Sequence, residues 1–471
     1  MFSWIVTIAV GWIALTVVNI AVLEVLIVVE GHRPGRAQAW APVLAVLPVI
    51  GFIVYFVFGR MPSRKFFARR RWPEAKLKSI SASQLASMTI HSRLVNTTLY
   101  AGFAPLAYHN KVTVLGNGRN KFGELFRVLE HAQQHIHIEY YIFKDDEIGG
   151  DLHRILSRKA REGVTVRLLV DGMGSHKLSA AFLNSLREAG VQVQQFLPLK
   201  LQFLGNKIHL RNHRKIVVVD GQVAMMGGMN VGDEYLSRDP QKGYWRDTHL
   251  LIEGEAVHSL QAAFSQDWYF VTEERLAGID YYPEPKHAGE QTVQIVAGGP
   301  DIPWHNVQQV FFAALSEARQ RIVIETPYFI PDSGTLMALE NAALAGLDVK
   351  LVVQGVPEYT TTYWASRSFF EGMLRAGVKI FLYEKGILHA KTMVIDDQVG
   401  VVGTANFDVR SFGLDFEVAA IIYDREFVEK LNQDIGLDLN NCRRLKPETF
   451  YARSFGERFK EGNARFLSLV L

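Results

Sequence analysis

The sequence contains one α/β pattern twice. In each copy a buried strand is followed by a helical pattern, a second strand, another helical pattern and an Ala-Gly-Val tripeptide before a third strand. The matched segments are 137–143 with 323–329, 163–170 with 346–353, and 189–191 with 376–378. Because apolar strands alternate with helical patterns in the same order in both copies, we expect an α/β fold with two related domains.

The domain boundaries follow from this repeat. Residues 273–291 contain Pro283, Pro285 and several charges, a composition that is typical of a linker. We therefore place the first domain at 72–272 and the second at 292–471, each within the usual size range of a domain. Two similar domains that form a pseudo-twofold pair can each present the same short motif to one shared cleft.

Each copy contains His-x-Lys-x(4)-Asp, followed at the same spacing by Gly and Asn. The residues are His213, Lys215, Asp220, Gly227 and Asn230 in the first copy, and His389, Lys391, Asp396, Gly403 and Asn406 in the second. Two matches in register within an independent repeat are a much stronger signal than one match. His and Lys two apart on a strand share a face, so both point into one pocket. Each Asp lies at an odd separation and at a hairpin turn, so we interpret these two members of the catalytic motif as turn and scaffold residues.

The paired motifs suit a metal-free transfer of a phosphodiester. Lysine ammonium groups and the amides of Asn230 and Asn406 can donate to phosphate oxygens. One imidazole can attack phosphorus and form a phosphohistidine, while the other protonates the leaving alkoxide and later deprotonates the acceptor. A histidine nucleophile needs its second ring nitrogen held by a carboxylate or carbonyl, and Asp247 and Glu417 are candidates for that orienting role.

Structural and metal-binding interpretations are weaker. A lone strand histidine is most often structural and a lone lysine is most often solvated, but two motifs in register argue against this explanation. Two histidines without a clustered set of carboxylates do not form a typical metal site, so we expect no metal and no cofactor. Cys442 is the only cysteine, which excludes an intramolecular disulfide and a cysteine-rich metal centre.

Two apolar runs precede the first copy. Residues 4–29 contain Glu24 as the only ionisable side chain, and residues 40–58 contain no charge. A bilayer core is spanned by about 20 residues, so we predict a two-helix transmembrane hairpin within residues 1–71. A cleaved signal peptide is less compatible, because a second span follows directly. Two basic residues lie between the runs and six at 60–71, which predicts catalytic domains on the cytoplasmic side.

The net charge of +3 hides an asymmetry along the chain. Residues 1–71 hold eight Lys and Arg against two Glu, a local charge of +6, so the other 400 residues sum to −3. A slightly acidic catalytic part is a poor match for nucleic acid, whereas the basic flank would attract anionic membrane lipid. We therefore expect lipid, and not nucleic acid, as the partner.

Together these residues resemble the phospholipase D superfamily and, within it, the bacterial cardiolipin synthases. The resemblance covers essentially the whole chain and rests on the hairpin, both motifs and the segments 138–141, 212–215, 244–247, 298–300, 326–329 and 403–411. It implies two tandem phospholipase D-like α/β/α domains attached to the bacterial cytoplasmic (inner) membrane by a multi-pass hairpin. It also implies transfer of a phosphatidyl group from one phosphatidylglycerol to another, with release of glycerol.

The resemblance further assigns His213 as the nucleophile and His389 as the general acid and base, although the residues themselves do not decide between the two. Gly228 stands where Ser or Thr is common in the superfamily, whereas the second copy has Thr404. We expect both positions to contact the phosphate, with a hydroxyl donor missing from the first half.

Other functions share the same catalytic pair. A membrane-anchored phospholipase D-type phosphodiesterase or nuclease would use water where the synthase uses a lipid hydroxyl. Intact motifs argue against a catalytically silent lipid-binding scaffold. The acceptor alcohol and the oligomeric state, a homo-oligomer included, stay open at this stage.

The C-terminal tail interleaves basic and apolar side chains from Tyr451 onward. This pattern predicts an amphipathic segment, which either enters the inner leaflet or docks as a helix on the second domain.

Overall fold

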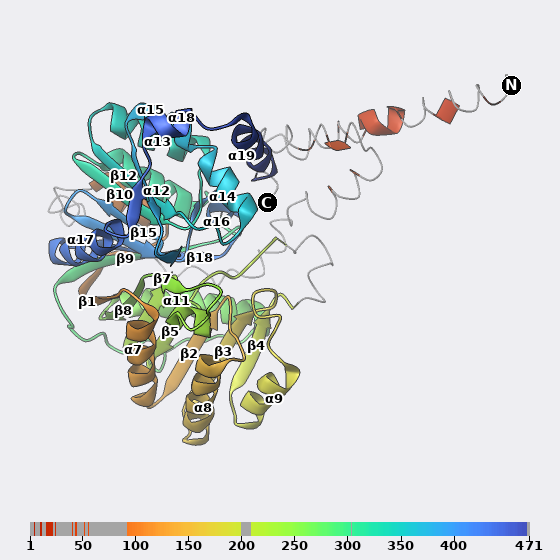
Figure 1. Cartoon of the computed structure of the whole chain (residues 1–471). Helices are drawn as coiled ribbons and strands as arrows, with labels where there is room; N and C mark the ends of the chain where they lie inside the picture. The colour runs from red at the N-terminus through yellow and green to blue at the C-terminus, as the bar shows by residue number, and fades with distance from the viewer. Residues whose placement is uncertain are drawn as a thin grey trace.

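The computed structural model describes residues 92–198, 209–302 and 304–468, together with isolated positions before residue 56 (Figure 1). Apart from those positions, the predicted transmembrane hairpin and its basic flank lie outside the described residues. Within the described part of the chain, no helix is both long and apolar enough to cross a membrane.

A fifteen-stranded mixed sheet runs through both halves of the molecule. The first half contributes β1 (Ala107–Leu115), β2 (His135–Tyr140), β3 (Thr165–Asp171), β4 (Gln192–Phe196), β5 (Ile216–Val219), β6 (Val223–Gly227) and β8 (His249–Glu253). The second contributes β9 (Gln291–Gly298), β10 (Arg321–Thr326), β12 (Asp348–Gln354), β13 (Lys379–Tyr383), β15 (Thr392–Ile395), β16 (Val399–Gly403), β18 (Glu417–Tyr423) and the edge strand β19 (Cys442–Arg444).

The strand order repeats between the halves. It is β1-β8-β6-β5-β2-β3-β4 in the first half and β9-β18-β16-β15-β10-β12-β13 in the second, with β1 paired to β9 in the middle. β2, β3 and β4 are parallel, as are β10, β12 and β13, whereas the hairpins β5-β6 and β15-β16 are antiparallel. The α/β fold with two similar halves that the repeat predicts is therefore confirmed.

Helices cover both faces of the sheet (Figure 1). They are α6 (Ser92–Tyr100), α7 (Gly118–Glu130), α8 (Glu147–Arg161), α9 (Ala180–Glu188), α11 (Ala256–Thr272), α12 (Asn306–Glu317), α13 (Ser333–Leu344), α14 (Thr360–Arg367), α15 (Phe370–Ala376), α16 (Val409–Gly413), α17 (Arg425–Leu439), α18 (Pro447–Tyr451) and α19 (Phe455–Ser468), with a 3-10 turn at Asp233–Leu236. Short strands β7 (Tyr244–Arg246) with β14 (Gly386–Leu388), and β11 (Phe329–Ile330) with β17 (Phe407–Asp408), form two small parallel pairs.

One hydrophobic core crosses the boundary between the halves. Leu260 of α11 and Leu431 of α17 belong to the same buried cluster, which also contains Leu250 of β8 and Ile295 of β9. Burial of apolar side chains from both halves in one cluster opposes their separation, because parting them would return that surface to water. The two halves are therefore joined by packing as well as by the β1-β9 ladder.

The N-terminal helix of the described body packs across the predicted domain boundary. α6 lies against α12, and its Leu94 belongs to the core of the second half. The segment after the predicted hairpin thus precedes the first half in sequence but contacts the second half in space. A repeat search does not detect this contact, because α6 has no counterpart in the second copy.

The two motif aspartates lie in the hairpin turns, in the left-handed region, both at φ 53°. The Asp220 carboxylate accepts the backbone N–H groups of residues 133–135, each at 2.8 Å. The Asp396 carboxylate accepts those of residues 319–321, with the shortest bond, at 2.8 Å, from Gln320. Each aspartate ties its hairpin to the start of the neighbouring strand, β2 or β10, the contact that a scaffold role requires.

We expect Asp396→Ala to lower the thermal midpoint of the full chain, because three backbone donors lose a charged acceptor. Leaving a buried donor unsatisfied costs about 1–3 kcal/mol of folding free energy. The thermal midpoint of the Asp396→Asn protein should lie between those of the unchanged protein and the Asp396→Ala protein, since asparagine tolerates the left-handed region and keeps one acceptor. Asp397→Ala is the matched control, because Asp397 is half exposed and pairs only at the surface with Arg321. Equal midpoints for the Asp396→Ala and Asp397→Ala proteins would contradict the scaffold role.

Candidate active site

The motif histidines lie in extended segments next to strand ends. His213 and Lys215 immediately precede β5, and His389 and Lys391 lie between β14 and β15, so all four are just outside the strands in which the spacing placed them. The shared face is kept, because each lysine reaches back to the histidine two residues earlier. Lys215 Nζ donates to the His213 carbonyl at 2.6 Å, and Lys391 Nζ donates to that of His389.

The backbone of each histidine is fixed by the opposite half of the chain. The His213 N–H donates to the carbonyl of Phe416 at 2.9 Å, and the His389 N–H donates to that of Arg246 at 2.7 Å. β14 leads into His389 and pairs with β7, which ends at Arg246. The residue that follows each accepting carbonyl, Glu417 or Asp247, is one of the two acids predicted to orient a histidine.

The two carboxylates also cross between the halves. Glu417 Oε1 and Oε2 lie 3.0 and 3.1 Å from His213 Nδ1, and Asp247 Oδ2 lies 2.8 Å from His389 Nδ1. Both carboxylate side chains are fully buried, whereas the histidine side chains keep 13% and 11% exposure. A carboxylate on Nδ1 fixes the tautomer that leaves Nε2 for chemistry. The geometry thus pairs each predicted histidine with one of the two predicted acids.

Two buried arginines donate hydrogen bonds to the backbone carbonyls of these acids. Arg214 Nε donates to the Glu417 carbonyl at 3.1 Å and pairs with Asp267 of α11 at 2.5 Å. Arg246 Nη1 donates to the Asp247 carbonyl at 2.6 Å and pairs with Asp438 of α17. Sequence reasoning missed both arginines, although each lies in a segment that carried the family resemblance. Arg214 lies between His213 and Lys215, and Arg246 directly precedes Asp247, but one sequence does not distinguish such an arginine from an ordinary surface charge.

Burial makes the lysines unusually easy to deprotonate. It lowers the pKa of Lys215 to about 7 and that of Lys391 to about 8. Glu417 and Asp247 act in the opposite direction on both ammonium groups, because a nearby negative charge favours the cation. A phosphodiester bound between these lysines would add negative charge and favour their protonated forms further.

Burial also lowers the pKa of both imidazoles. For His213 the pKa falls well below its ordinary value, with Lys215, Lys391 and His389 adding to the effect of burial. For His389 burial and Lys391 lower the pKa, but the hydrogen bond that its ring donates to Asp247 opposes them. Because the charge of each motif acts on the other, the four residues form one electrostatic cluster.

Gly228 and Thr404 contact the orienting carboxylates. The Thr404 hydroxyl donates to Glu417 and accepts the Val418 N–H at 2.9 Å. A Cβ on Gly228 would lie 2.0 Å from Oδ1 of Asp247, so the acid itself fills the space of a side chain. The structure therefore places both positions beside the orienting acids and explains why the first half has no hydroxyl there, while their contact with phosphate stays a prediction.

The motif asparagines differ from each other. Asn230 Nδ2 donates to the Tyr235 hydroxyl at 2.7 Å, and its Oδ1 accepts the Ile142 N–H at 3.0 Å, so this side chain fixes a loop. Asn406 Oδ1 is buried without a hydrogen-bond partner in the described part of the chain. Of the two motif asparagines, Asn230 therefore has partners for both of its polar side-chain atoms, whereas Asn406 has none for its Oδ1 in the described part of the chain.

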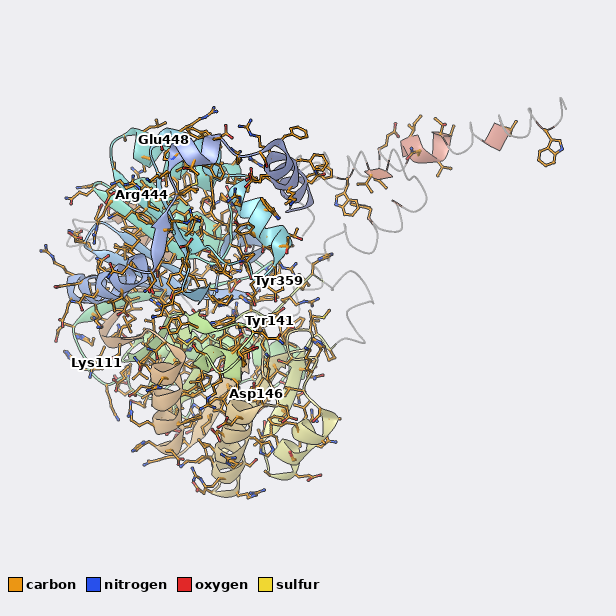
Figure 2. All side chains as sticks on the ribbon, in the orientation of Figure 1. Lys111, Tyr141, Asp146, Tyr359, Arg444 and Glu448 are labelled. Carbon is orange, nitrogen blue, oxygen red and sulfur yellow. The ribbon has the colours of Figure 1, made fainter. Side chains whose placement is uncertain are left out.

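Aromatic side chains border both histidines. The Tyr141 ring lies 4.9 Å from His213, and the Trp245 ring lies 5.2 Å from His389, both measured between centroids. Figure 2 shows Tyr141 and Tyr359 at the boundary between the two halves. Next to Tyr359, Glu358 accepts from the Tyr328 hydroxyl at 3.0 Å and pairs with Lys242 of the first half at 3.1 Å. The motif search missed Glu358 because it stands in a loop outside every repeated segment.

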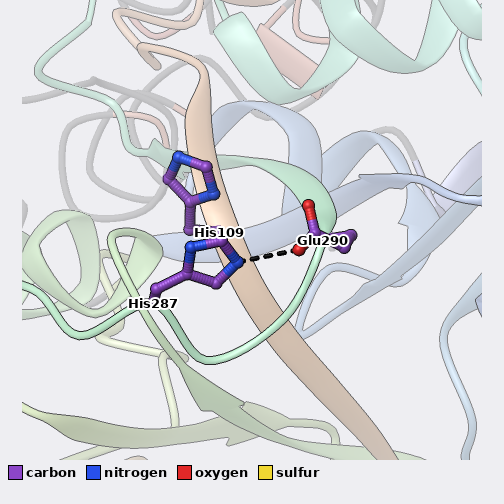
Figure 3. A group of neighbouring side chains, drawn as sticks. All are labelled: His109, His287 and Glu290. Atoms are coloured by element: carbon purple, nitrogen blue, oxygen red, sulfur yellow. Dashed lines mark hydrogen bonds and ion pairs between the residues drawn. The ribbon is translucent and has the colours of Figure 1, made fainter.

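A separate group of potential metal ligands lies outside this cluster. His109 of β1 and His287 and Glu290 of the segment 273–290 have ligand atoms within 4.8 Å of one another (Figure 3). All three side chains are exposed, and His287 Nε2 already bonds Glu290 at 2.8 Å. Among the described residues, none of these three side chains makes a contact with His213 or His389.

Comparisons with known proteins agree with the site. A family model described as cardiolipin synthase, PLD-like domain, matches residues 125–268 and 311–438, and a phospholipase D-nuclease N-terminal model matches residues 14–60. A cardiolipin synthase of Geobacillus kaustophilus is 43% identical over 463 residues, which cover 96% of this chain and 92% of that protein. The major cardiolipin synthase ClsA of Bacillus subtilis is 38% identical, over an alignment that covers 97% of this chain and 98% of that protein.

Among solved structures, a phosphatidylserine synthase of Haemophilus influenzae superposes with a TM-score of 0.62 at 14% identity, over 80% of this chain and 100% of its own. At that identity the likeness concerns the fold alone. The full-length relatives and the family model, which matches both halves, confirm the resemblance found in the sequence. The chain belongs to the bacterial cardiolipin synthases, phosphatidyltransferases of the phospholipase D superfamily.

Proposed function

We propose that the chain makes cardiolipin from two phosphatidylglycerol molecules through a phosphohistidine on His213. The observation that supports this most is the crossed pairing of His213 with Glu417 and of His389 with Asp247. Each pair leaves one Nε2 for the substrate, so the two imidazoles can act on the same phosphorus from its two sides. Two lysines supply the positive charge that a phosphodiester needs in a metal-free site.

In the first step, His213 Nε2 attacks the phosphorus of phosphatidylglycerol, and the bond between phosphorus and the headgroup glycerol oxygen breaks. His389 donates its Nε2 proton to the leaving alkoxide, and glycerol departs. In the second step, His389 takes the proton of a hydroxyl on another phosphatidylglycerol. That oxygen attacks phosphorus, the P–N bond breaks, and His213 is restored as cardiolipin leaves.

The electrostatics support this division of roles. Neighbouring positive groups add to burial in lowering the pKa of His213, which keeps its imidazole neutral and nucleophilic. The hydrogen bond that the His389 ring donates to Asp247 opposes the lowering of the His389 pKa, as a general acid that must carry a proton requires. Thr404 donates to Glu417 and has no hydroxyl counterpart at Gly228, so the two half-sites are chemically unequal.

We also propose that a two-span hairpin within residues 1–71 anchors the chain in the bacterial cytoplasmic membrane, with both halves on the cytoplasmic side. The N-terminal family model covers residues 14–60, which include most of both apolar runs. Trp4 and Val10, two of the described positions, are 77% and 60% exposed, as apolar side chains in contact with lipid would be. This arrangement would give the pseudo-twofold pair of halves direct access to phosphatidylglycerol.

The reaction is tested with the purified full chain in mixed micelles of phosphatidylglycerol, where we expect cardiolipin and glycerol in equal amounts. His213→Ala should lower kcat by a factor on the order of 10⁴ or more, as removal of a nucleophile does elsewhere. After quenching in an alkaline denaturant, in which the P–N bond of a phosphohistidine persists, phosphate label from the substrate should remain on His389→Ala protein and be absent from His213→Ala protein. Phosphatidic acid without cardiolipin would contradict the synthase, and the reverse labelling would exchange the two histidines.

Thr404→Val should lower kcat roughly ten- to hundredfold, because Glu417 would lose a donor in a buried site, a change of about 1–3 kcal/mol. Thr404→Ser keeps the hydroxyl and should retain most of the activity. KM for phosphatidylglycerol should change little in both variants, since the hydroxyl contacts Glu417. A matching loss in the serine variant, or a change confined to KM, would instead favour direct phosphate binding.

The value of kcat/KM for phosphatidylglycerol should fall as pH rises through about 7 to about 8, the pKa values of Lys215 and Lys391. The sign follows because lysine binds a phosphate as a cation only below its pKa, and kcat/KM reports the free enzyme. Lys215→Arg keeps its charge across this range, so in that variant the alkaline decline should move to higher pH. An unchanged profile in the Lys215→Arg protein would show that another group causes the decline.

A further inference from the structure

The last described helix, α19, is fixed to the second half through one face. Glu461 is 2% exposed and pairs with Arg367 at 3.1 Å and with Arg453 at 2.8 Å. Ala464, on the same face, belongs to the core of the second half. α19 also packs along α14. These contacts make the helix a firm part of the molecular surface.

The opposite face of α19 is aromatic and exposed. Phe455, Phe459 and Phe466 are 82%, 62% and 48% exposed within the described chain. They lie four and seven residues apart, the spacing of one helix face, and together with Arg458, Gly462 and Asn463 they line a shallow groove. Large apolar side chains gathered on one face mark a surface that contacts another apolar phase.

Basic residues flank this aromatic face. Arg458, Lys460 and Arg465 are all exposed and lie on the same helix. Aromatic rings bordered by Lys and Arg are typical of helices that lie in the interface of a bilayer with anionic lipids. Figure 1 places α19 on the side of the body toward which the described N-terminal positions extend. Both features favour a lipid surface over a second protein as the partner.

The helix is also close in structure to the reaction centre. Arg367 of α14 binds Glu461 of α19, and α14 begins directly after Glu358 and Tyr359. Glu358 holds the Tyr328 hydroxyl and acts electrostatically on His389. One helix therefore separates α19 from the residues on the second-half side of the site.

We propose that α19 is a docking helix, with Phe455, Phe459 and Phe466 inserted into the interface of a bilayer that contains anionic lipid. This contact holds the second half of the enzyme against the surface that supplies its lipid substrates. The proposal deepens the proposed function, on which it rests for the identity of the substrate. The contact itself follows from the shape and charge of α19.

The contact is tested with the full chain in vesicles of phosphatidylglycerol and phosphatidylcholine. In a Cys442→Ser background, Phe459→Cys carries an environment-sensitive fluorophore, and lipids with a spin label in their acyl chains act as the quencher. Leu437→Cys is the matched control, because Leu437 is 64% exposed on α17, which Figure 1 places at the opposite side of the body. We expect quenching at position 459, weaker quenching in phosphatidylcholine alone, and none at position 437.

No quenching at position 459, or equal quenching at both positions, would overturn the proposal. A fluorophore shielded from water at position 459 but not quenched by the labelled lipid would also overturn it, and would identify a protein segment or a second copy as the occupant.

A second measurement uses activity. Phe455→Ser combined with Phe459→Ser should lower the rate on vesicles several-fold and leave the rate on monomeric short-chain phosphatidylglycerol unchanged. Leu437→Ser should affect neither rate. An unchanged rate on vesicles, or equal loss on both substrates, would contradict a docking role.

The outcomes separate this proposal from the proposed function. Quenching at position 459 in a protein that releases phosphatidic acid without cardiolipin would support docking and contradict the synthase reaction. Cardiolipin formation without quenching at position 459 would support the synthase reaction and contradict docking.

Discussion

Each motif histidine depends on a carboxylate from the other half of the chain. Glu417 lies against His213, and Asp247 lies against His389, in sites where burial opposes charge on the imidazole. Because both the hydrogen-bonded acid and the backbone acceptor of each histidine come from across the boundary, neither half can assemble a complete site. The join between the halves therefore assembles the candidate active site, in addition to being a feature of the fold.

Several levels of structure maintain that join. The β1-β9 ladder connects the two sets of strands, and α11 and α17 bury side chains in one common core. The same two helices supply Asp267 and Asp438, which bind the arginines behind the orienting acids. A buried arginine without its acid would be strongly unfavourable, so these pairs restrict how far the helices can shift. Packing and site geometry are thus stabilised by the same elements.

Much of this could be predicted from the sequence, for identifiable physical reasons. Strand periodicity and the duplicated motif predicted the alternation of strands and helices along each half, the hairpin turns at Asp220 and Asp396, and the histidines and acids that the structure brings together. The crossing of the acids could not be predicted, because local patterns carry no information on which half supplies a contact. The contact of Thr404 with Glu417 lies within the second half, and it was missed because spacing in the sequence does not show which side chains meet across neighbouring strands. The glycine at position 228 is explained only by the structure, in which the Asp247 carboxylate fills the space that a side chain there would need.

The β1-β9 ladder, described above as a join, also limits how the enzyme can move. β1 and β9 pair antiparallel at two positions on either side of a register shift, and one core packs side chains from both halves, so parting the halves would break this pairing and expose apolar surface. A fixed pair of half-sites suits the proposed covalent intermediate. The phosphohistidine would hold the phosphatidyl group in place while glycerol leaves and the second phosphatidylglycerol enters, which is a ping-pong order of substrates.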